Sequence, residues 1–184
     1  MDTLIDIDID GVLLDSMGAF LRETSLGRVK DCTDYDLDKV FGKGTFLAFK
    51  KFIKDYSERI FPYPKAMESL ARLSEKYQIQ VCSTRDEEEQ KLFEKQYHYP
   101  VISKHSLTKC YYEAILIDDY PPRNLLFAFR ETYIIEHPWN QKVIYPSFNG
   151  STKYWNSFKE VTKYLLEIDE NYWMELKWVG SKNL

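Results

Sequence analysis

The stretch DIDGV at residues 8–12 places two carboxylates, Asp8 and Asp10, at the end of a segment, residues 3–9, in which isoleucine and aspartate alternate. This alternation predicts a β-strand, and Gly11 allows the sharp turn that would end it. Asp8 and Asp10 are two residues apart and are therefore expected to face the same way. Two carboxylates this close do not both ionise at low free-energy cost. A bound divalent cation would suit one of them, and protonation would suit the other to acid catalysis.

Polar residues also follow two short apolar segments farther along the chain. Residues 79–83 end in Ser83, and the wholly apolar residues 114–117 are followed by Asp118 and Asp119. Strands that alternate with helices predict a Rossmann-like α/β fold, in which helices cover both faces of a parallel sheet. Because ligands bind at the carboxyl ends of such strands, these polar residues are expected to lie beside the DIDGV carboxylates. Further strands are expected at 101–102 and 133–135, and helices at 16–24, 45–60, 66–77, 86–96 and 155–167.

The composition narrows the class of protein. The 184 residues, 44% hydrophobic and 29% charged, suit one globular domain with a small insertion. A net charge of -4 and the lack of a basic stripe argue against binding to a nucleic acid polymer. Cys32, Cys82 and Cys110 show no metal-ligand spacing, and their odd number favours a reducing compartment. Without a basic signal-peptide start or an apolar run of about 20 residues, a cytoplasmic protein that does not bind membranes is expected.

Three motifs in order carry a family resemblance. DIDGV at 8–12, CSTR at 82–85 and LIDD at 116–119, with a lysine before the last strand, resemble the haloacid dehalogenase superfamily of phosphatases. The resemblance implies a phosphoric monoester hydrolase that requires Mg²⁺ and forms a phospho-aspartate. It also implies an α/β core with a small helical cap inserted after the first strand. We expect the core at residues 1–16 and 76–184, and the inserted cap at residues 17–75.

The resemblance implies a catalytic role for four positions. Asp8 corresponds to the nucleophile, and Asp10 to the residue that acts as general acid and then general base. Ser83 corresponds to the phosphate-binding hydroxyl, with Thr84 as the alternative ligand. The null interpretation of Ser83 is a hydrogen-bonded hydroxyl in the core.

The resemblance also implies a magnesium site. Its ligands would be the carboxylates of Asp8 and Asp119 and the backbone carbonyl of Asp10, with Asp118 supporting them. Mg²⁺ prefers a few carboxylates together with substrate phosphate and water, which fits this set. Alternatively, Asp118 and Asp119 would simply open a solvent-exposed turn.

The sequence does not define the roles of the basic residues near the motifs as clearly as those of the acidic residues. Lys109 is favoured as the phosphate-binding lysine because of its distance from the LIDD motif, and Lys104 is the competing candidate. Arg85 would either contact phosphate or form an exposed ion pair. The three histidines, His98, His105 and His137, lack partner spacing and are assigned no catalytic role.

A second, more local resemblance points to a substrate. IDDYPP at 117–122, HPWN at 137–140 and PYPKAMESLARLSEKY at 62–77 are similar to the 5'(3')-deoxyribonucleotidase group. This similarity implies a 5'-nucleotidase that acts on nucleoside monophosphates. Phe46 and Phe49 are candidate rings for the substrate pocket, although their helical spacing also fits a helix core. A phosphatase of sugars or other small metabolites, and a catalytically inactive binding module, remain the alternative functions.

Asp6 departs from the family pattern, in which an apolar or small residue usually stands two positions before the nucleophile. On the face of Asp8 it would add a third nearby carboxylate. A register that pairs Asp6 with Asp8 fails because Ile9 would then replace the required glycine. The sequence does not define the oligomeric state, and the segment 171–184 would pack on the core or on a partner.

Overall fold

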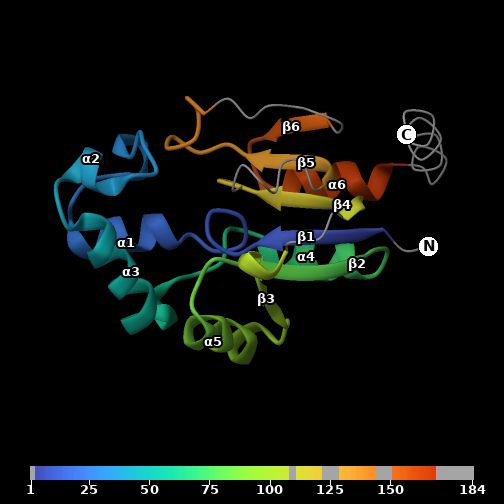
Figure 1. The fold of residues 1–184 in the computed structure, drawn as a ribbon, viewed down its shortest axis with the longest axis horizontal. Helices are drawn as coiled ribbons and strands as arrows, with labels where there is room; N and C mark the ends of the chain where they lie inside the picture. Colours follow the sequence, from blue (N-terminus) through green and yellow to red (C-terminus); the bar gives the residue numbers. More distant parts are fainter. Residues whose placement is uncertain (1–2, 108–110, 122–128, 144–150, 169–184) are drawn as a thin grey trace.

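The computed structural model describes residues 3–107, 111–121, 129–143 and 151–168. Its centre is a six-stranded parallel sheet with the strand order β3-β2-β1-β4-β5-β6, which confirms the predicted Rossmann-like α/β class (Figure 1). The strands are β1 (Leu4–Asp8), β2 (Gln78–Ser83), β3 (Val101–Ser103), β4 (Tyr111–Asp118), β5 (Phe129–Ile135) and β6 (Ser151–Trp155).

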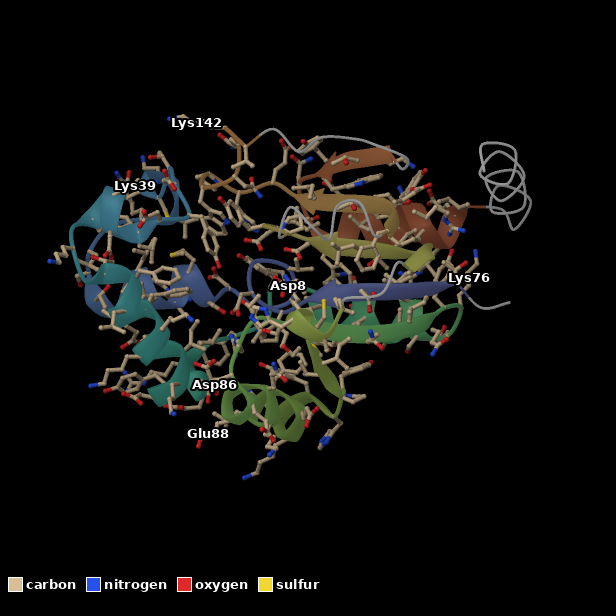
Figure 2. The ribbon with its side chains drawn as sticks, viewed as in Figure 1. Asp8, Lys39, Lys76, Asp86, Glu88 and Lys142 are labelled. Atoms are coloured by element: carbon tan, nitrogen blue, oxygen red, sulfur yellow. The ribbon has the colours of Figure 1, made fainter. Side chains whose placement is uncertain are left out.

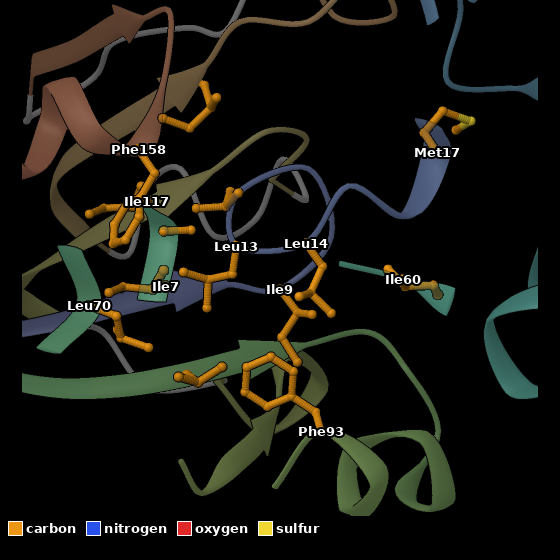
Figure 3. Close-up of a cluster of buried hydrophobic side chains, with 14 of the residues drawn as sticks. Ile7, Ile9, Leu13, Leu14, Met17, Ile60, Leu70, Phe93, Ile117 and Phe158 are labelled. Carbon is orange, nitrogen blue, oxygen red and sulfur yellow. The ribbon is translucent and has the colours of Figure 1, made fainter. Parts of the chain in front are cut away.

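Side chains of β1 and β4 alternate between two hydrophobic clusters, one on each face of the sheet. Ile7 and Ile117 belong to the larger cluster, whereas Leu116 belongs to a smaller one with Cys82 (Figure 3). The acidic side chains of β1, including Asp8, have the opposite parity to Ile7 and therefore lie on the face of the smaller cluster. The strand order reverses between β1 and β4, and open parallel sheets bind ligands at such a reversal.

Helices cover the sheet in the manner that the apolar periodicity predicts. Helix α4 (Ala66–Ser74) packs against α6 (Phe158–Glu167), and α5 (Glu87–Tyr97) packs along β3 at one edge. Asp86 begins α5 in a reciprocal capping box with Glu89, which satisfies two backbone N–H groups that the helix itself leaves free.

The remaining helices form a separate group beyond the carboxyl ends of the strands, which we call the cap (residues 16–60) (Figure 1). Asp15 is the N-cap residue of α1 and accepts a hydrogen bond from the backbone N–H of Gly18. The cap contains α1 (Ser16–Thr24), α2 (Leu37–Phe41) and α3 (Thr45–Asp55), with short 3₁₀ turns at Val29–Asp31 and Ser57–Arg59.

The sequence-based division places the end of the inserted cap at residue 75, after helix α4. Helix α4, which that division placed in the insertion, packs on α6 and β2 of the core. Its apolar face, which includes Leu70 and Leu73, is fully buried there. We therefore propose that the insertion ends before α4.

Two elements were not expected from the sequence. Strand β6 pairs with β5 although its sequence STKYW at 151–155 lacks an apolar pattern. Because this strand includes residue 155, helix α6 begins three residues later than expected. Helix α2 is one short turn inside a segment that contains three glycines. Within the described residues, no helix is both long and apolar enough to cross a lipid bilayer.

Candidate active site

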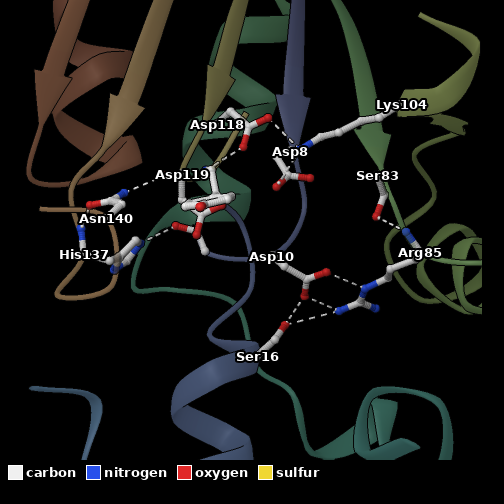
Figure 4. A network of polar contacts seen from close by, with 12 residues as sticks. Asp8, Asp10, Ser16, Ser83, Arg85, Lys104, Asp118, Asp119, His137 and Asn140 are labelled. Carbon is white, nitrogen blue, oxygen red and sulfur yellow. Dashed lines mark hydrogen bonds and ion pairs between the residues drawn. The ribbon is translucent and has the colours of Figure 1, made fainter. Parts of the chain in front are cut away.

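Asp8 lies where the sheet meets the cap (Figure 2). The last paired residues of β1 and β4 are Ile7 and Ile117, so Asp8 and Asp118 lie side by side one residue later. The buried Lys104 joins them, with its Nζ 2.9 Å from Asp8 Oδ2 and 2.6 Å from Asp118 Oδ2 (Figure 4). Burial favours the neutral amine, yet these two carboxylates raise the pKa of Lys104 well above its ordinary value. The lysine is therefore a fixed cation.

A third carboxylate, that of Asp119, makes the site more acidic than Lys104 alone can balance. Carboxylate oxygens of Asp8, Asp118 and Asp119 all lie within 4.8 Å of one another, and all three residues are buried. Burial and the neighbouring carboxylates raise the pKa of Asp8 to about 7 and that of Asp119 well above its usual range. Hard oxygen donors that share excess negative charge fit a divalent cation such as Mg²⁺.

The HPWN segment at 137–140 positions Asp119. Trp139 Nε1 donates to Asp119 Oδ2 at 2.8 Å, and Asn140 Nδ2 donates to the Asp119 carbonyl at 2.7 Å. His137 donates from Nε2 to the Gly11 carbonyl at 2.6 Å, because a carbonyl only accepts. The segment thus links the DIDGV turn to the second acidic motif (Figure 4).

Gly11 has no acceptable substitute in this arrangement. Its φ of 78° lies in the left-handed region, and a Cβ there would overlap the carboxylate of Asp119. The glycine of DIDGV therefore permits both the turn and the close approach of the Asp119 carboxylate.

Asp10 points toward a different set of partners. Arg85 donates from Nε to Asp10 Oδ2 at 2.8 Å and from Nη2 to Oδ1 at 2.6 Å, and the Ser16 hydroxyl also donates to Oδ1. Burial alone raises the pKa of Asp10, but the charge and hydrogen bonds of Arg85 outweigh it and hold that pKa below its ordinary value. These contacts favour the ionised form of Asp10, whereas the sequence predicted a protonated carboxyl for one member of the pair.

The two hydroxyl candidates differ in their surroundings. The Ser83 hydroxyl is buried and accepts the backbone N–H of Arg85 at 3.1 Å, so it shapes the turn after β2. Thr84 lines the cavity that contains Asp8, and Ser83 is not among the lining residues.

The same cavity extends from the strand ends to the cap. Phe46 and Phe49 of α3 line it, as expected, together with Tyr35, whose ring stacks on Tyr120 with centroids 4.3 Å apart. Phe49 also contacts Phe20 edge-on, so the same ring belongs to the core of the cap. Phe49 therefore belongs both to the cavity wall and to the packing of the cap, and contact of these rings with a substrate stays a prediction.

Two basic residues, Lys104 and Arg85, contact the carboxylates of the site more directly than their sequence positions indicated. Lys104 is the lysine that contacts Asp8, while the favoured Lys109 lies outside the described residues. Lys104 directly follows β3 and Arg85 comes two residues after β2, so both stand at strand carboxyl ends. The rule used for the acidic motifs would have identified both basic residues. The segment 171–184, expected to pack on the core or a partner, also lies outside the described residues.

Asp6 is fully buried on β1 and takes no part in the acidic site. Gln80 donates to its Oδ1 at 2.7 Å, whereas Oδ2 has no hydrogen-bond partner. Burial raises the pKa of Asp6 to about 6, despite the opposing hydrogen bond from Gln80.

Comparison with solved structures identifies the fold. L-2-haloacid dehalogenase from Xanthobacter autotrophicus superposes with a TM-score of 0.59 at 11% identity, covering 92% of this chain and 100% of that one. D,D-heptose 1,7-bisphosphate phosphatase from Burkholderia thailandensis gives 0.52 at 12% identity, covering 90% and 99%. A HAD-hydrolase from Bacillus subtilis bound to magnesium gives 0.51 at 10% identity, covering 91% and 99%.

No protein-family model and no curated protein matches the sequence. The structural matches show that the chain has the fold of haloacid dehalogenase-like hydrolases.

Proposed function

We propose that the protein is a Mg²⁺-dependent phosphomonoesterase that forms a phospho-aspartate on Asp8 and acts on nucleoside monophosphates. The observation that carries the proposal is the cluster of Asp8, Asp118 and Asp119 at the strand-order reversal. Lys104 pairs with Asp8 and Asp118, and Asp8 and Asp119 line a cavity. The fold, shared with a bisphosphate phosphatase and a magnesium-bound hydrolase, supports this chemistry over a binding module.

Asp8 and Asp119, with the backbone carbonyl of Asp10, would hold the cation. Their oxygens are of the type that Mg²⁺ prefers. Burial, and after it the neighbouring carboxylates, raise the pKa values of Asp8 and Asp119, so a bound cation would stabilise their ionised forms. When bound, Mg²⁺ would neutralise charge on the phosphoryl group.

In the proposed reaction, a carboxylate oxygen of Asp8 attacks phosphorus while the bond from phosphorus to the leaving-group oxygen breaks. Lys104 and the hydroxyl of Thr84 or Ser83 stabilise charge on the transferring phosphoryl group. Water then hydrolyses the phospho-aspartate as Asp10 accepts its proton, which releases phosphate and regenerates Asp8.

The contacts of Asp10 suit the second half of this cycle directly. Held ionised by Arg85 and Ser16, the carboxylate can act as a base. To protonate the leaving alkoxide in the first half, Asp10 must first bind a proton, so some of these contacts must be replaced when substrate binds.

The cap residues that line the cavity favour a substrate with a flat leaving group. Phe46, Phe49 and Tyr35 line the cavity beside the acidic cluster, and aromatic rings contribute about 1–3 kcal/mol when a nucleobase stacks on them. Together with the similarity of the HPWN and IDDYPP motifs to deoxyribonucleotidases, this favours a nucleoside monophosphate over a sugar phosphate.

Phosphate release tests the proposal. Purified protein with Mg²⁺ is expected to hydrolyse p-nitrophenyl phosphate, to lose activity with EDTA, and to regain it when Mg²⁺ is restored. In a panel of dUMP, dTMP, UMP and AMP against hexose phosphates, kcat/KM should be highest for a nucleotide.

A tenfold advantage for a sugar phosphate, about 1.4 kcal/mol in transition-state binding, would exclude the nucleotidase while retaining the phosphatase. Halide release from 2-chloropropionate without any phosphate release would overturn the phosphatase as well.

A further inference from the structure

One face of α3 forms the cap side of the cavity. Phe46, Phe49, Lys50 and Ile53 all line it, and their spacing of three, four and seven residues puts them on one side of the helix. Three of the four are apolar, so this wall of the cavity carries a single cation.

Lys50 differs from the other two cations that line the cavity, Arg85 and Lys104, in having no partner of opposite charge among the described residues. Lys104 is paired with Asp8 and Asp118, and Arg85 with Asp10. Among the described residues, Lys50 forms no ion pair, and its Nζ lies 5.9 Å from the centroid of the Phe46 ring.

The next turn of α3 provides a contrast. Lys54 lies four residues after Lys50, and its Nζ pairs with a carboxylate oxygen of Glu88 on α5 at 2.7 Å. A lysine of this helix can therefore have an acidic partner from a neighbouring helix. The cation that faces the cavity is left unpaired beside an aromatic ring, which is an arrangement suited to a ligand that brings its own acceptor.

We infer that Lys50 binds an acceptor oxygen, either a carboxylate or a carbonyl, at the end of the leaving group remote from the phosphate. The inference rests on the proposed function and narrows its substrates to flat leaving groups that end in such an oxygen. Phe46 and Phe49 would contact the ring, Lys50 its far end, and the acidic cluster with its metal the phosphate. Lys50 is thus a specificity-determining residue.

Binding of phosphonates tests the inference without requiring turnover. Benzylphosphonate, 4-acetylbenzylphosphonate and 4-carboxybenzylphosphonate share the anion and the ring and differ only at the far end. Titration calorimetry of the full chain with Mg²⁺ would give their Kd values for wild type, Lys50→Ala, Lys50→Arg and the control Lys51→Ala. Lys51 is the next residue of α3 and does not line the cavity.

Lys50→Ala should weaken the carboxylate ligand about fivefold, since an exposed cation is partly screened, and the acetyl ligand less. Benzylphosphonate should bind both proteins equally, Lys50→Arg should restore most of the affinity, and Lys51→Ala should change none of the three. Equal losses for all three ligands, or no loss for the carboxylate ligand, would overturn the inference.

The proposed function can fail independently. If wild type binds these ligands in the expected order but releases no phosphate from p-nitrophenyl phosphate, the phosphatase is wrong and the role of Lys50 in recognition stands. If wild type binds none of the three ligands, the inference is overturned.

Discussion

The two walls of the cavity differ in how their charged side chains are paired. On the core wall, Asp8, Asp10 and Lys104 are each held by at least one partner of opposite charge within 3 Å. On the cap wall, formed by the cavity-facing residues of α3, the side chains are apolar except for Lys50, which has no such partner.

This difference teaches how the fold separates reaction from recognition. Charged groups that act on phosphorus need fixed positions, because stabilisation of developing charge depends on donors that do not have to reorganise. A wall that recognises a ligand increases affinity through its apolar area, and through a cation that has no ion-pair partner until the ligand supplies an acceptor. Substitutions on the core wall should therefore lower kcat, and those on the cap wall should raise KM.

The largest effect is expected from Asp8→Asn. The amide is not a nucleophile toward phosphorus, so kcat/KM should fall by at least about 10³-fold while the fold is retained. Phosphate release from p-nitrophenyl phosphate would measure the loss. Asp6→Asn is the matched control on the same face of the same strand and should stay within about twofold of wild type. Near-normal turnover by Asp8→Asn would eliminate the phospho-aspartate mechanism.

Lys104→Met should have the next largest effect, because it removes the cation between two buried carboxylates. We expect a kcat about 10²-fold lower and, in EDTA, a free energy of unfolding lower by about 3 kcal/mol. Part of that stability should return with Mg²⁺, which would replace some of the missing positive charge.

Thermal unfolding with and without Mg²⁺, together with phosphate release, would test the lysine. Lys109→Met is the direct comparison, since Lys109 was the residue that the sequence favoured. A greater loss of activity in Lys109→Met would make Lys109 the phosphate-binding residue and contradict the assignment of Lys104.

On the cap wall, Phe46→Ala should raise KM for a nucleoside monophosphate about fivefold to tenfold, as expected for the loss of one stacking ring. The effect on p-nitrophenyl phosphate should be smaller, and kcat should change little. Leu47→Ala, at an adjacent position that is 73% exposed, is the control and should change neither constant. A fall in kcat with unchanged KM would show that the two walls do not divide the work in this way.

Asp6→Asn should affect activity least and should reveal a pH dependence of stability. The folded pKa of about 6 exceeds the ordinary 3.8, so the folded state holds the proton more tightly and loses stability as pH rises between these values. Asparagine does not ionise. Relative to wild type, the substitution should leave the free energy of unfolding unchanged below about pH 4 and raise it by up to about 3 kcal/mol above pH 6. Chemical unfolding at several pH values would measure it, and a gain independent of pH would rule out ionisation as the cause.

Much of the fold could be predicted because its signals are local. The alternation in residues 3–9, the apolar run before Asp118 and the spacing of Leu70 and Leu73 each define an element without knowledge of the rest. Strand β6 was missed because STKYW at 151–155 has no apolar pattern, and its pairing with β5 decides its conformation.

For the site, the sequence by itself determined that Asp8 and Asp119 converge, because both follow strands whose carboxyl ends meet at one edge of a parallel sheet. Only the tertiary structure decided that Lys104 contacts Asp8, that Arg85 lowers the pKa of Asp10, and that Lys50 forms no ion pair within the described part of the chain. The physical reason is that strand ends follow from local periodicity, whereas the partner of a charge depends on the path of each loop and on free energies summed through space.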